Sequence, residues 1–247
     1  MRESFRIHAL DILHCCAIIS AYIFCVNMKI AVYTSIIGDF DELKTQPVQS
    51  VNCDFICFTD NDNVKSDFWR VVHTDFVGNT SRFKAKYPKC FPHQLLWDYD
   101  ITYWIDGSVL LKKNSTLEEL IQLMGQNENL YFKHPDRDCI YDECEVSMNM
   151  PKYKGHSLRE QVSKYKKAGY PEHNGLVACT TILRKNTMNN RTLNEAWYNE
   201  MSDDLIQDQL SLPYVSWKAG VKINAVDINL WNNEYVLFGS HKNGRQD

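Results

Sequence analysis

Short apolar runs, each closed by polar residues or glycine, alternate along this chain with longer stretches of mixed polarity. Runs of this length that are rich in Val, Ile, Phe, Tyr and Trp are typical of buried strands. The predicted strands are residues 30–35, 55–60, 69–72, 101–105, 130–133, 176–183 and 235–238. The run at residues 101–105 is wholly apolar or aromatic apart from one threonine, so we expect it to be the central strand.

The stretches between these strands favour helices. The predicted helices are residues 115–120, 157–168 and 192–201. Residues 82–96 mix basic and aromatic side chains and are interrupted by Pro88 and Pro92, so they predict short helical pieces. Strands that alternate with helices predict one α/β domain with a mostly parallel, doubly wound central sheet flanked by helices.

Size and charge narrow the range of functions. A chain of 247 residues that is 44% hydrophobic can bury the core of one ordinary α/β domain. Its net charge of -4 provides no basic footprint, which argues against nucleic acid as the main partner. The nine cysteines form no CxxC pair, which indicates reduced and mostly buried thiols rather than a zinc site or a disulfide framework.

The N-terminal segment allows several interpretations. Residues 12–26 are mostly apolar but fall short of the roughly 20 residues needed to span a bilayer. The segment could be a signal-peptide core or a poor signal anchor. Alternatively, Met28 is the true start and residues 1–27 are an upstream extension. The expected organisation is therefore a leader or extension over 1–27 and one domain over 28–247.

This organisation sets the expected location of the protein. Membrane contact is expected only through residues 9–26. The expected location is the cytoplasm, with at most a weak membrane association. A location in the secretory pathway follows instead if residues 1–27 are a genuine leader.

Polar residues gather where three of the predicted strands end. In open α/β sheets, ligands bind at the carboxyl ends of the strands. A carboxylate there can hold a ribose hydroxyl or a metal ion, and a glycine lets a ligand approach the backbone closely. One such group is an ordinary turn, but three together favour a nucleotide pocket. The candidates for binding its ligand are Thr34, Ser35, Gly38, Asp60, Asp106 and Gly107.

Ordered motifs extend this picture. They are "YTSIIGDFDEL", "CFTDN", "RFKAKYPKCFPHQLLWDYDITYWIDGS", "KHPDRDCIYDE", "YPEHNGLVACTTILRKN", "AWYNEM" and "QDQLSLPYVSWKAG". In this order they resemble a glycosyltransferase-like family, formerly a domain of unknown function, found in bacteria, viruses and plant Golgi proteins of the mucilage-related type. The resemblance runs from about Lys29 to about His241. It implies a GT-A fold that binds a nucleotide-sugar donor at the first half of the sheet.

The resemblance also implies a metal motif, but only half of it is present. GT-A enzymes usually place Asp-x-Asp after an apolar strand, where the two carboxylates hold Mn²⁺ or Mg²⁺ on the donor diphosphate. Asp106 matches the first carboxylate, and Ser108 stands at the second position. Either His241 completes the metal site, as a C-terminal histidine does in glycogenin-like transferases, or no metal is used and cations stabilise the leaving group. A solvated histidine in the tail is an equal alternative.

Basic residues must meet the diphosphate in either case. Arg82, Lys84 and Lys86 alternate, so they would share one face of an extended segment, although their spacing also fits a ragged helix start. A solvated face is the usual meaning of such a cluster. The resemblance favours donor binding.

Two further segments are candidates for the acceptor or the donor sugar. His134, Arg137 and Tyr141 form a polar block directly after a strand, and Glu143 in the same block is a catalytic candidate. A structural salt bridge between Arg137 and Glu143 is an equal alternative. Asn174-Gly175 resembles the acceptor-side loop of the family, although Asn-Gly is also a common turn.

The pair Asp208-Gln209 lies in an apolar frame, where a charge needs a reason. Glycogenin-like retaining enzymes carry Asp-Gln at a comparable place beside the reacting sugar. By that analogy, Asp208 would act as a base on the acceptor hydroxyl or stabilise the oxocarbenium-like transition state. The alternative is an Asp that caps a helix or is satisfied within the core.

These features predict a glycosyltransferase that moves a sugar from a nucleoside diphosphate to the hydroxyl of a glycan or another acceptor, with Mn²⁺ or Mg²⁺ as its cofactor. The missing second Asp supports an alternative, a non-catalytic domain that binds nucleotide-sugars or glycans. A metal-dependent hydrolase built on Asp106 and His241 is a third hypothesis.

Overall fold

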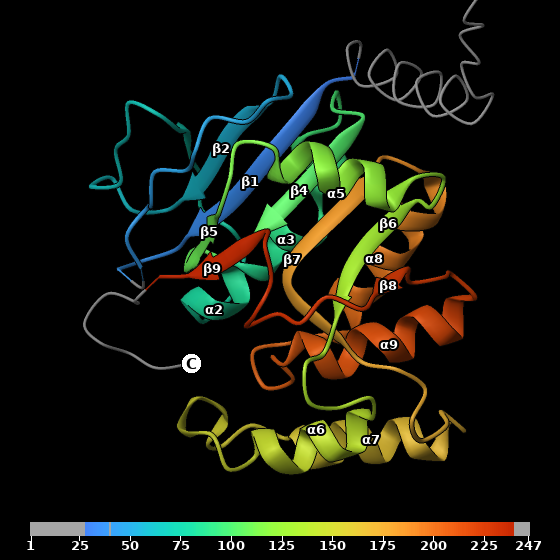
Figure 1. Cartoon of the computed structure of the whole chain (residues 1–247). Coiled ribbons are helices and arrows are strands. Elements are labelled where there is room, and N and C mark those ends of the chain that lie inside the picture. The colour runs from blue at the N-terminus through green and yellow to red at the C-terminus, as the bar shows by residue number, and fades with distance from the viewer. Residues whose placement is uncertain (1–27, 40, 240–247) are drawn as a thin grey trace, which may run out of the picture.

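The computed structural model describes residues 28–39 and 41–239, and its centre is a seven-stranded sheet (Figure 1). The strand order is β3-β2-β1-β4-β7-β6-β8. The strands are β1 (Ile30–Ile36), β2 (Asp54–Thr59), β3 (Arg70–His73), β4 (Ile101–Ile105), β6 (Asn129–Lys133), β7 (Val177–Lys185) and β8 (Ala225–Val226). Of these, β7 runs antiparallel to both neighbours, and the other pairs are parallel. The predicted α/β class is confirmed, with β4 central and the sheet mostly parallel, as in a single GT-A-like domain.

Helices cover both faces of this sheet (Figure 1). On one face lies α5 (Thr116–Met124), next to the small sheet formed by β5 (Val109–Leu111) and β9 (Val236–Phe238). The other face is covered by α3 (Lys86–Cys90), α8 (Met188–Glu200) and α9 (Asp208–Ala219). The remaining helices are α2 (Ser81–Lys84), α4 (Pro92–Leu95), α6 (Ile140–Ser147), the short η1 (Pro151–Tyr153) and α7 (Leu158–Lys167).

The apolar runs are continuous because the strands are buried on both faces. Along β1, Ile30 and Val32 pack into the core that contains α5. Their neighbours Ala31 and Tyr33 pack into the opposite core with α3, α8 and α9. Successive side chains of a strand point to opposite faces, so each of the two cores receives every second residue.

The six parallel strands, β1, β2, β3, β4, β6 and β8, end at one edge of the sheet, and the reversed β7 begins there. The backbone continues this order past the end of β4, where the Asp106 amide donates to the Thr180 carbonyl at 2.9 Å. Residues that follow different strands therefore meet at this carboxyl edge.

Two other expectations concern the thiols and the N-terminus. The six cysteines within the described residues are free, and five of them are buried, as predicted. Within the same residues no helix is long and apolar enough to cross a bilayer. The predicted leader, residues 1–27, and the proposed metal ligand His241 both lie outside the described residues.

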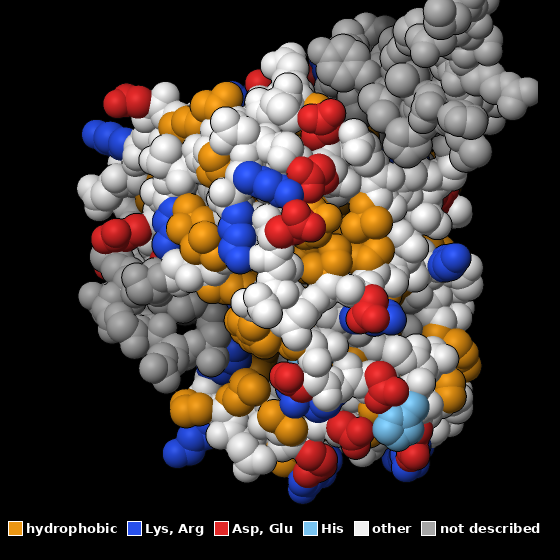
Figure 2. Space-filling view, viewed as in Figure 1, with side chains coloured by type: hydrophobic (Ala, Val, Ile, Leu, Met, Phe, Trp, Pro, Cys, Tyr) orange, Lys and Arg blue, Asp and Glu red, His pale blue; other side chains and the backbone are white. Residues whose placement is uncertain are grey.

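Charged side chains of both signs are intermixed over the face shown in Figure 2. Acidic side chains gather over the part formed by α6 and α7, with basic ones between them. This face therefore carries no continuous basic stripe of the kind that follows a phosphate backbone.

Candidate functional site

Asp60, directly after β2, connects the ends of β1 and β2. Its carboxylate accepts a hydrogen bond from the Gly38 amide at 2.6 Å, and the Asn61 side chain donates to the Gly38 carbonyl at 2.8 Å. The hydroxyls of Thr34 and Ser35, near the end of β1, are buried and have no hydrogen-bond partner among the described residues. Unpaired buried hydroxyls are unusual and suit a place where a ligand supplies the partner.

The end of β4 presents Asp106 to the same edge. Its Oδ1 accepts a hydrogen bond from the Trp104 indole at 2.6 Å, and one third of the side chain is exposed. Gly107 has a packing reason for being glycine, because a Cβ there would lie 2.8 Å from Ile36 Cδ1. Ser108 is 3% exposed and so lies below the surface.

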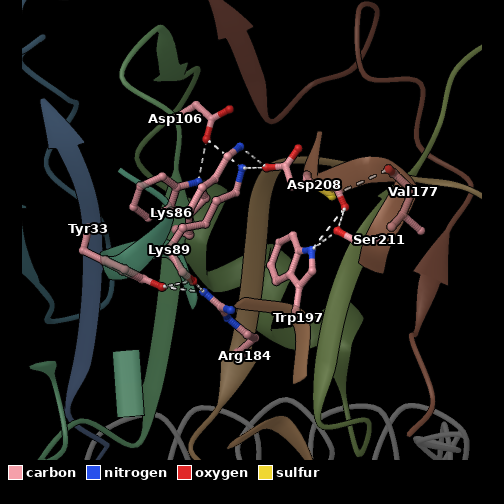
Figure 3. Close-up of polar contacts among 11 residues, drawn as sticks. Tyr33, Lys86, Lys89, Asp106, Val177, Arg184, Trp197, Asp208 and Ser211 are labelled. Atoms are coloured by element: carbon pink, nitrogen blue, oxygen red, sulfur yellow. Dashed lines mark hydrogen bonds and ion pairs between the residues drawn. The ribbon is translucent and has the colours of Figure 1, made fainter. Parts of the chain in front are cut away.

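Two lysines of α3 connect Asp106 with Asp208, the first residue of α9 (Figure 3). Lys86 and Lys89 are three residues apart, so they project from the same side of this short helix. Both ammonium groups lie 2.7 Å from Asp208 Oδ2, and Lys89 is also 3.3 Å from Asp106 Oδ1. We call these four residues, Lys86, Lys89, Asp106 and Asp208, the lysine–aspartate cluster.

The cluster is buried and balanced in charge. Only 4% of the Lys89 side chain, 12% of Lys86 and 10% of Asp208 is exposed. Burial alone would raise the pKa of Asp208, but Lys86 and Lys89 outweigh it and hold that pKa well below the usual range. Burial raises the pKa of Asp106 against the opposing effect of Lys89.

These shifts bear on the chemistry open to Asp208. A carboxylate with a strongly lowered pKa is a weak proton acceptor near neutral pH. Of the two roles predicted for Asp208, electrostatic stabilisation of a positively charged sugar fits the cluster better than general-base catalysis. Its neighbour Gln209 lies half-buried in the first turn of α9.

The core holds both helices of the cluster in place. Arg184 of β7 is 1% exposed and donates to the Lys89 carbonyl at 2.7 Å and to the Tyr33 hydroxyl. The indole of Trp197, on α8, donates to the Asp208 carbonyl at 3.1 Å. Figure 3 shows Arg184 and Trp197 below the cluster.

The other predicted phosphate ligands have different partners. The helical alternative is the one adopted, with Arg82 and Lys84 on α2 and Lys86 at the start of α3. Arg82 donates to the Lys152 carbonyl at 3.0 Å and lies over the Tyr153 ring. Lys84 pairs with Asp75 at 2.6 Å and with Asp60 at 3.8 Å, so it stays beside the first strand ends.

The predicted acceptor residues surround a cavity of about 730 Å³ at the same edge, where β6 ends and β7 begins. Its lining includes His134, Arg137, Asn174, Gly175, Tyr170 and Trp217. Tyr141 is not among the lining residues, and its hydroxyl donates to the Tyr170 carbonyl at 2.7 Å. A larger cavity of about 970 Å³ lies at the opposite edge, among residues that precede β2, β3 and β4.

Glu143 is 2% exposed and fully engaged. It accepts hydrogen bonds from Arg137 at 2.6 Å and from Ser147 and Gln207 at 2.9 Å. The predicted structural alternative, an Arg137–Glu143 salt bridge, is thus the contact observed. Through it, Glu143 fixes one wall of the acceptor-side cavity.

The described residues by themselves do not form a divalent-cation site at Asp106. Asp208 is held by two ammonium groups, and a hydroxyl such as that of Ser108 is a weak metal ligand. The other predicted ligand, His241, lies outside the described residues. Metal binding stays a prediction.

Lys89 and Trp104 both contact Asp106, although the sequence did not predict either as a site residue. A signal for Lys89 was present, because "KYPK" places two lysines at helical spacing. Pro88 suggested an interruption, yet it lies in the first turn of α3, where a proline removes no helical hydrogen bond.

Comparison with known proteins finds a matching family model and a curated relative. The family model described as "TOD1/MUCI70, glycosyltransferase-like domain" matches residues 58–237, a range that contains the whole lysine–aspartate cluster. The chain is also 25% identical over 174 residues to the probable hexosyltransferase MUCI70 of Arabidopsis thaliana. That match covers 66% of this chain but 30% of the length of the plant protein.

Proposed function

The chain belongs to the TOD1/MUCI70 glycosyltransferase-like domain family, and from this premise we propose that it transfers a sugar from a nucleoside-diphosphate-sugar to an acceptor hydroxyl. The observation that carries the proposal is the lysine–aspartate cluster, which places two ammonium groups and two carboxylates at the carboxyl edge of a GT-A-like sheet. A diphosphate leaving group needs cations, and a positively charged sugar needs a nearby carboxylate. The cluster offers both.

The donor side of the site comprises the first strand ends. Asp60 would contact the ribose, and Gly38 and the free hydroxyl of Ser35, on the α3 face of the sheet, would line the pocket. The free hydroxyl of Thr34 lies on the opposite face of β1. Lys84 and Lys86 would meet the phosphates, with Arg82 behind them. The name of the plant relative, a probable hexosyltransferase, supports a hexose as the donor sugar.

The acceptor side is the cavity between β6, β7 and α9. Trp217 is 43% exposed and lines it, and its flat ring suits the apolar face of a sugar. Asn174 and the backbone at Gly175 supply polar groups on the same wall. Because α9 begins at Asp208 and carries Trp217 farther along, one helix joins the acceptor side to the cluster.

A donor-turnover assay tests the proposal. The chain is incubated with a panel of UDP- and GDP-sugars with and without Mn²⁺, and the release of UDP or GDP is measured. Asp106→Asn and Asp208→Asn should lose turnover, while Asp98→Asn, which removes an exposed carboxylate at the opposite edge, should retain it. Unchanged turnover in both cluster variants would refute the assignment of these residues.

Ser108 in place of a second acidic residue favours one alternative, a domain that binds nucleotide-sugars or glycans without catalysis. The same panel separates the two functions. Stabilisation by UDP or GDP in a thermal-shift assay, with no turnover of any donor or transfer to an added oligosaccharide, would favour the binding domain.

A further inference from the structure

The two lysines of the cluster carry N–H donors that have no acceptor within the described residues. An ammonium group has three N–H donors. In the described part of the chain, Lys86 directs one to Asp208, and Lys89 directs one to Asp208 and one to Asp106. Two donors on Lys86 and one on Lys89 therefore have no acceptor among the described residues. The cluster reaches solvent at Asp106, so a ligand can approach from that side.

The Lys89 ammonium lies where a divalent cation bound to Asp106 would have to be close to it. A cation bound to Asp106 would lie close to the Lys89 ammonium, which is 3.3 Å from Asp106 Oδ1. The Lys89 side chain is 4% exposed and pairs with both Asp208 and Asp106, so turning away from a cation would break both ion pairs. Like charges this close in a buried site repel each other strongly.

We infer that the ammonium groups of Lys86 and Lys89, rather than a divalent cation, hold the leaving diphosphate. This inference rests on the proposed function and assigns Lys89 a binding role that the sequence did not suggest. Asp208 holds both lysines in position before the donor arrives, and Asp106 also holds Lys89. Burial lowers the pKa of Lys86, and the Asp208 carboxylate opposes that effect. The diphosphate then takes the unused N–H donors.

The transfer itself balances without a metal. The bond between the anomeric carbon and the β-phosphate oxygen breaks, and its electron pair stays on the diphosphate. The acceptor oxygen forms the new bond to the anomeric carbon, and the acceptor proton is released to water. Lys86 and Lys89 remain protonated throughout and neutralise the charge that develops on the diphosphate.

Calorimetric titration with UDP and with GDP, in EDTA and in Mn²⁺, tests this inference. The unsubstituted chain should bind one of the two nucleotides in EDTA, and Mn²⁺ should change its affinity by less than about threefold. Lys86→Met and Lys89→Met should weaken binding by about tenfold or more, since each removes charged hydrogen bonds. Lys89→Arg should retain binding because it keeps the charge.

Lys113→Met is the matched control. Lys113 also bridges two carboxylates, Glu119 and Glu234 at 2.7 Å each, but lies outside the site. Its loss should leave nucleotide affinity unchanged. Circular dichroism and thermal melting establish that each variant is folded, and Lys86→Met alone suffices if Lys89→Met does not fold.

Each other outcome has a definite meaning. Binding and turnover that vanish in EDTA and return with Mn²⁺ would overturn the inference and leave the transferase proposal standing. Lys86→Met binding the nucleotide as well as the unsubstituted chain would also overturn it. Failure of the unsubstituted chain to bind either nucleotide or turn over any donor, with or without Mn²⁺, would overturn both.

Discussion

Replacing Asp208 by Asn should strengthen nucleotide binding while it abolishes transfer. Asp208 accepts hydrogen bonds from both lysines, so it competes with a diphosphate for the same ammonium groups. A phosphate oxygen bound to one of these ammonium groups would lie roughly 5 Å from the Asp208 carboxylate. At an effective dielectric constant of ~20, two unit charges at that distance repel by about 3 kcal/mol. Asparagine keeps the shape of the Asp208 side chain but is uncharged, so it removes this repulsion.

Only part of that energy will appear as affinity. Solvent, the loosened lysines and a further fall in the pKa of Lys86, which burial already lowers, offset some of it. We expect UDP or GDP to bind more tightly by about 1–2 kcal/mol, a factor of roughly 5–30. The substitution should also lower the free energy of unfolding by about 3 kcal/mol, because it leaves two buried ammonium groups with a single carboxylate. Calorimetry, urea denaturation and donor turnover measure the three effects. Weaker nucleotide binding in a folded Asp208→Asn variant would refute the competition, and Asp98→Asn should change none of the three.

Three further predictions concern the scaffold. Arg184→Met should lower the free energy of unfolding by about 2–4 kcal/mol, because it removes a buried group that binds three elements, and a loss below about 1 kcal/mol in urea denaturation would contradict this. The side-chain hydrogen bond from His173 to Asp138 raises the pKa of the imidazole, so the stabilisation by this pair is present below the ordinary pKa of about 6.5 and is lost as the pH rises through the raised value. NMR titration should show the pKa of His173 falling toward its ordinary value in Asp138→Asn, and an unchanged pKa would contradict the assignment. Burial raises the pKa of the Cys57 and Cys90 thiols to about 12, so peptides with these residues should resist iodoacetamide in the native protein at about pH 8 and react once it is unfolded, as mass spectrometry can show.

The sequence was sufficient to predict the elements of the fold because local patterns determine them. Apolar runs located the strands of the central sheet, apart from the two-residue β8. The helix predicted at residues 192–201 begins earlier, at Met188, because the Thr187 side chain caps it by accepting from the Asn190 amide. Neither the strand order nor the reversed direction of β7 leaves a local pattern, since a buried strand has the same composition in either direction.

The candidate site was predictable in its parts but not in its assembly. Asp106 stood out as a carboxylate after a buried strand, and Asp208 as a charge in an apolar frame. The contact that unites them runs through Lys89, which is 119 residues from Asp208 in the chain. No periodicity spans such a separation, so only the packing of α3 and α9 on the same face of the sheet brings these residues together.

The position of Lys89 illustrates how the core and the site depend on each other. A helix as short as α3 has little stability of its own, so tertiary contacts must fix it. Arg184 provides such a contact, because it joins the Lys89 carbonyl to the Tyr33 hydroxyl of β1 and also donates to Asn194 of α8. Burying a charged guanidinium costs free energy, and the hydrogen bonds to these three acceptors offset that cost. Arg184 of β7 thus helps to fix where the two lysines of α3 meet their two carboxylates. A change at Arg184 should therefore disturb nucleotide binding, although Arg184 does not contact the ligand.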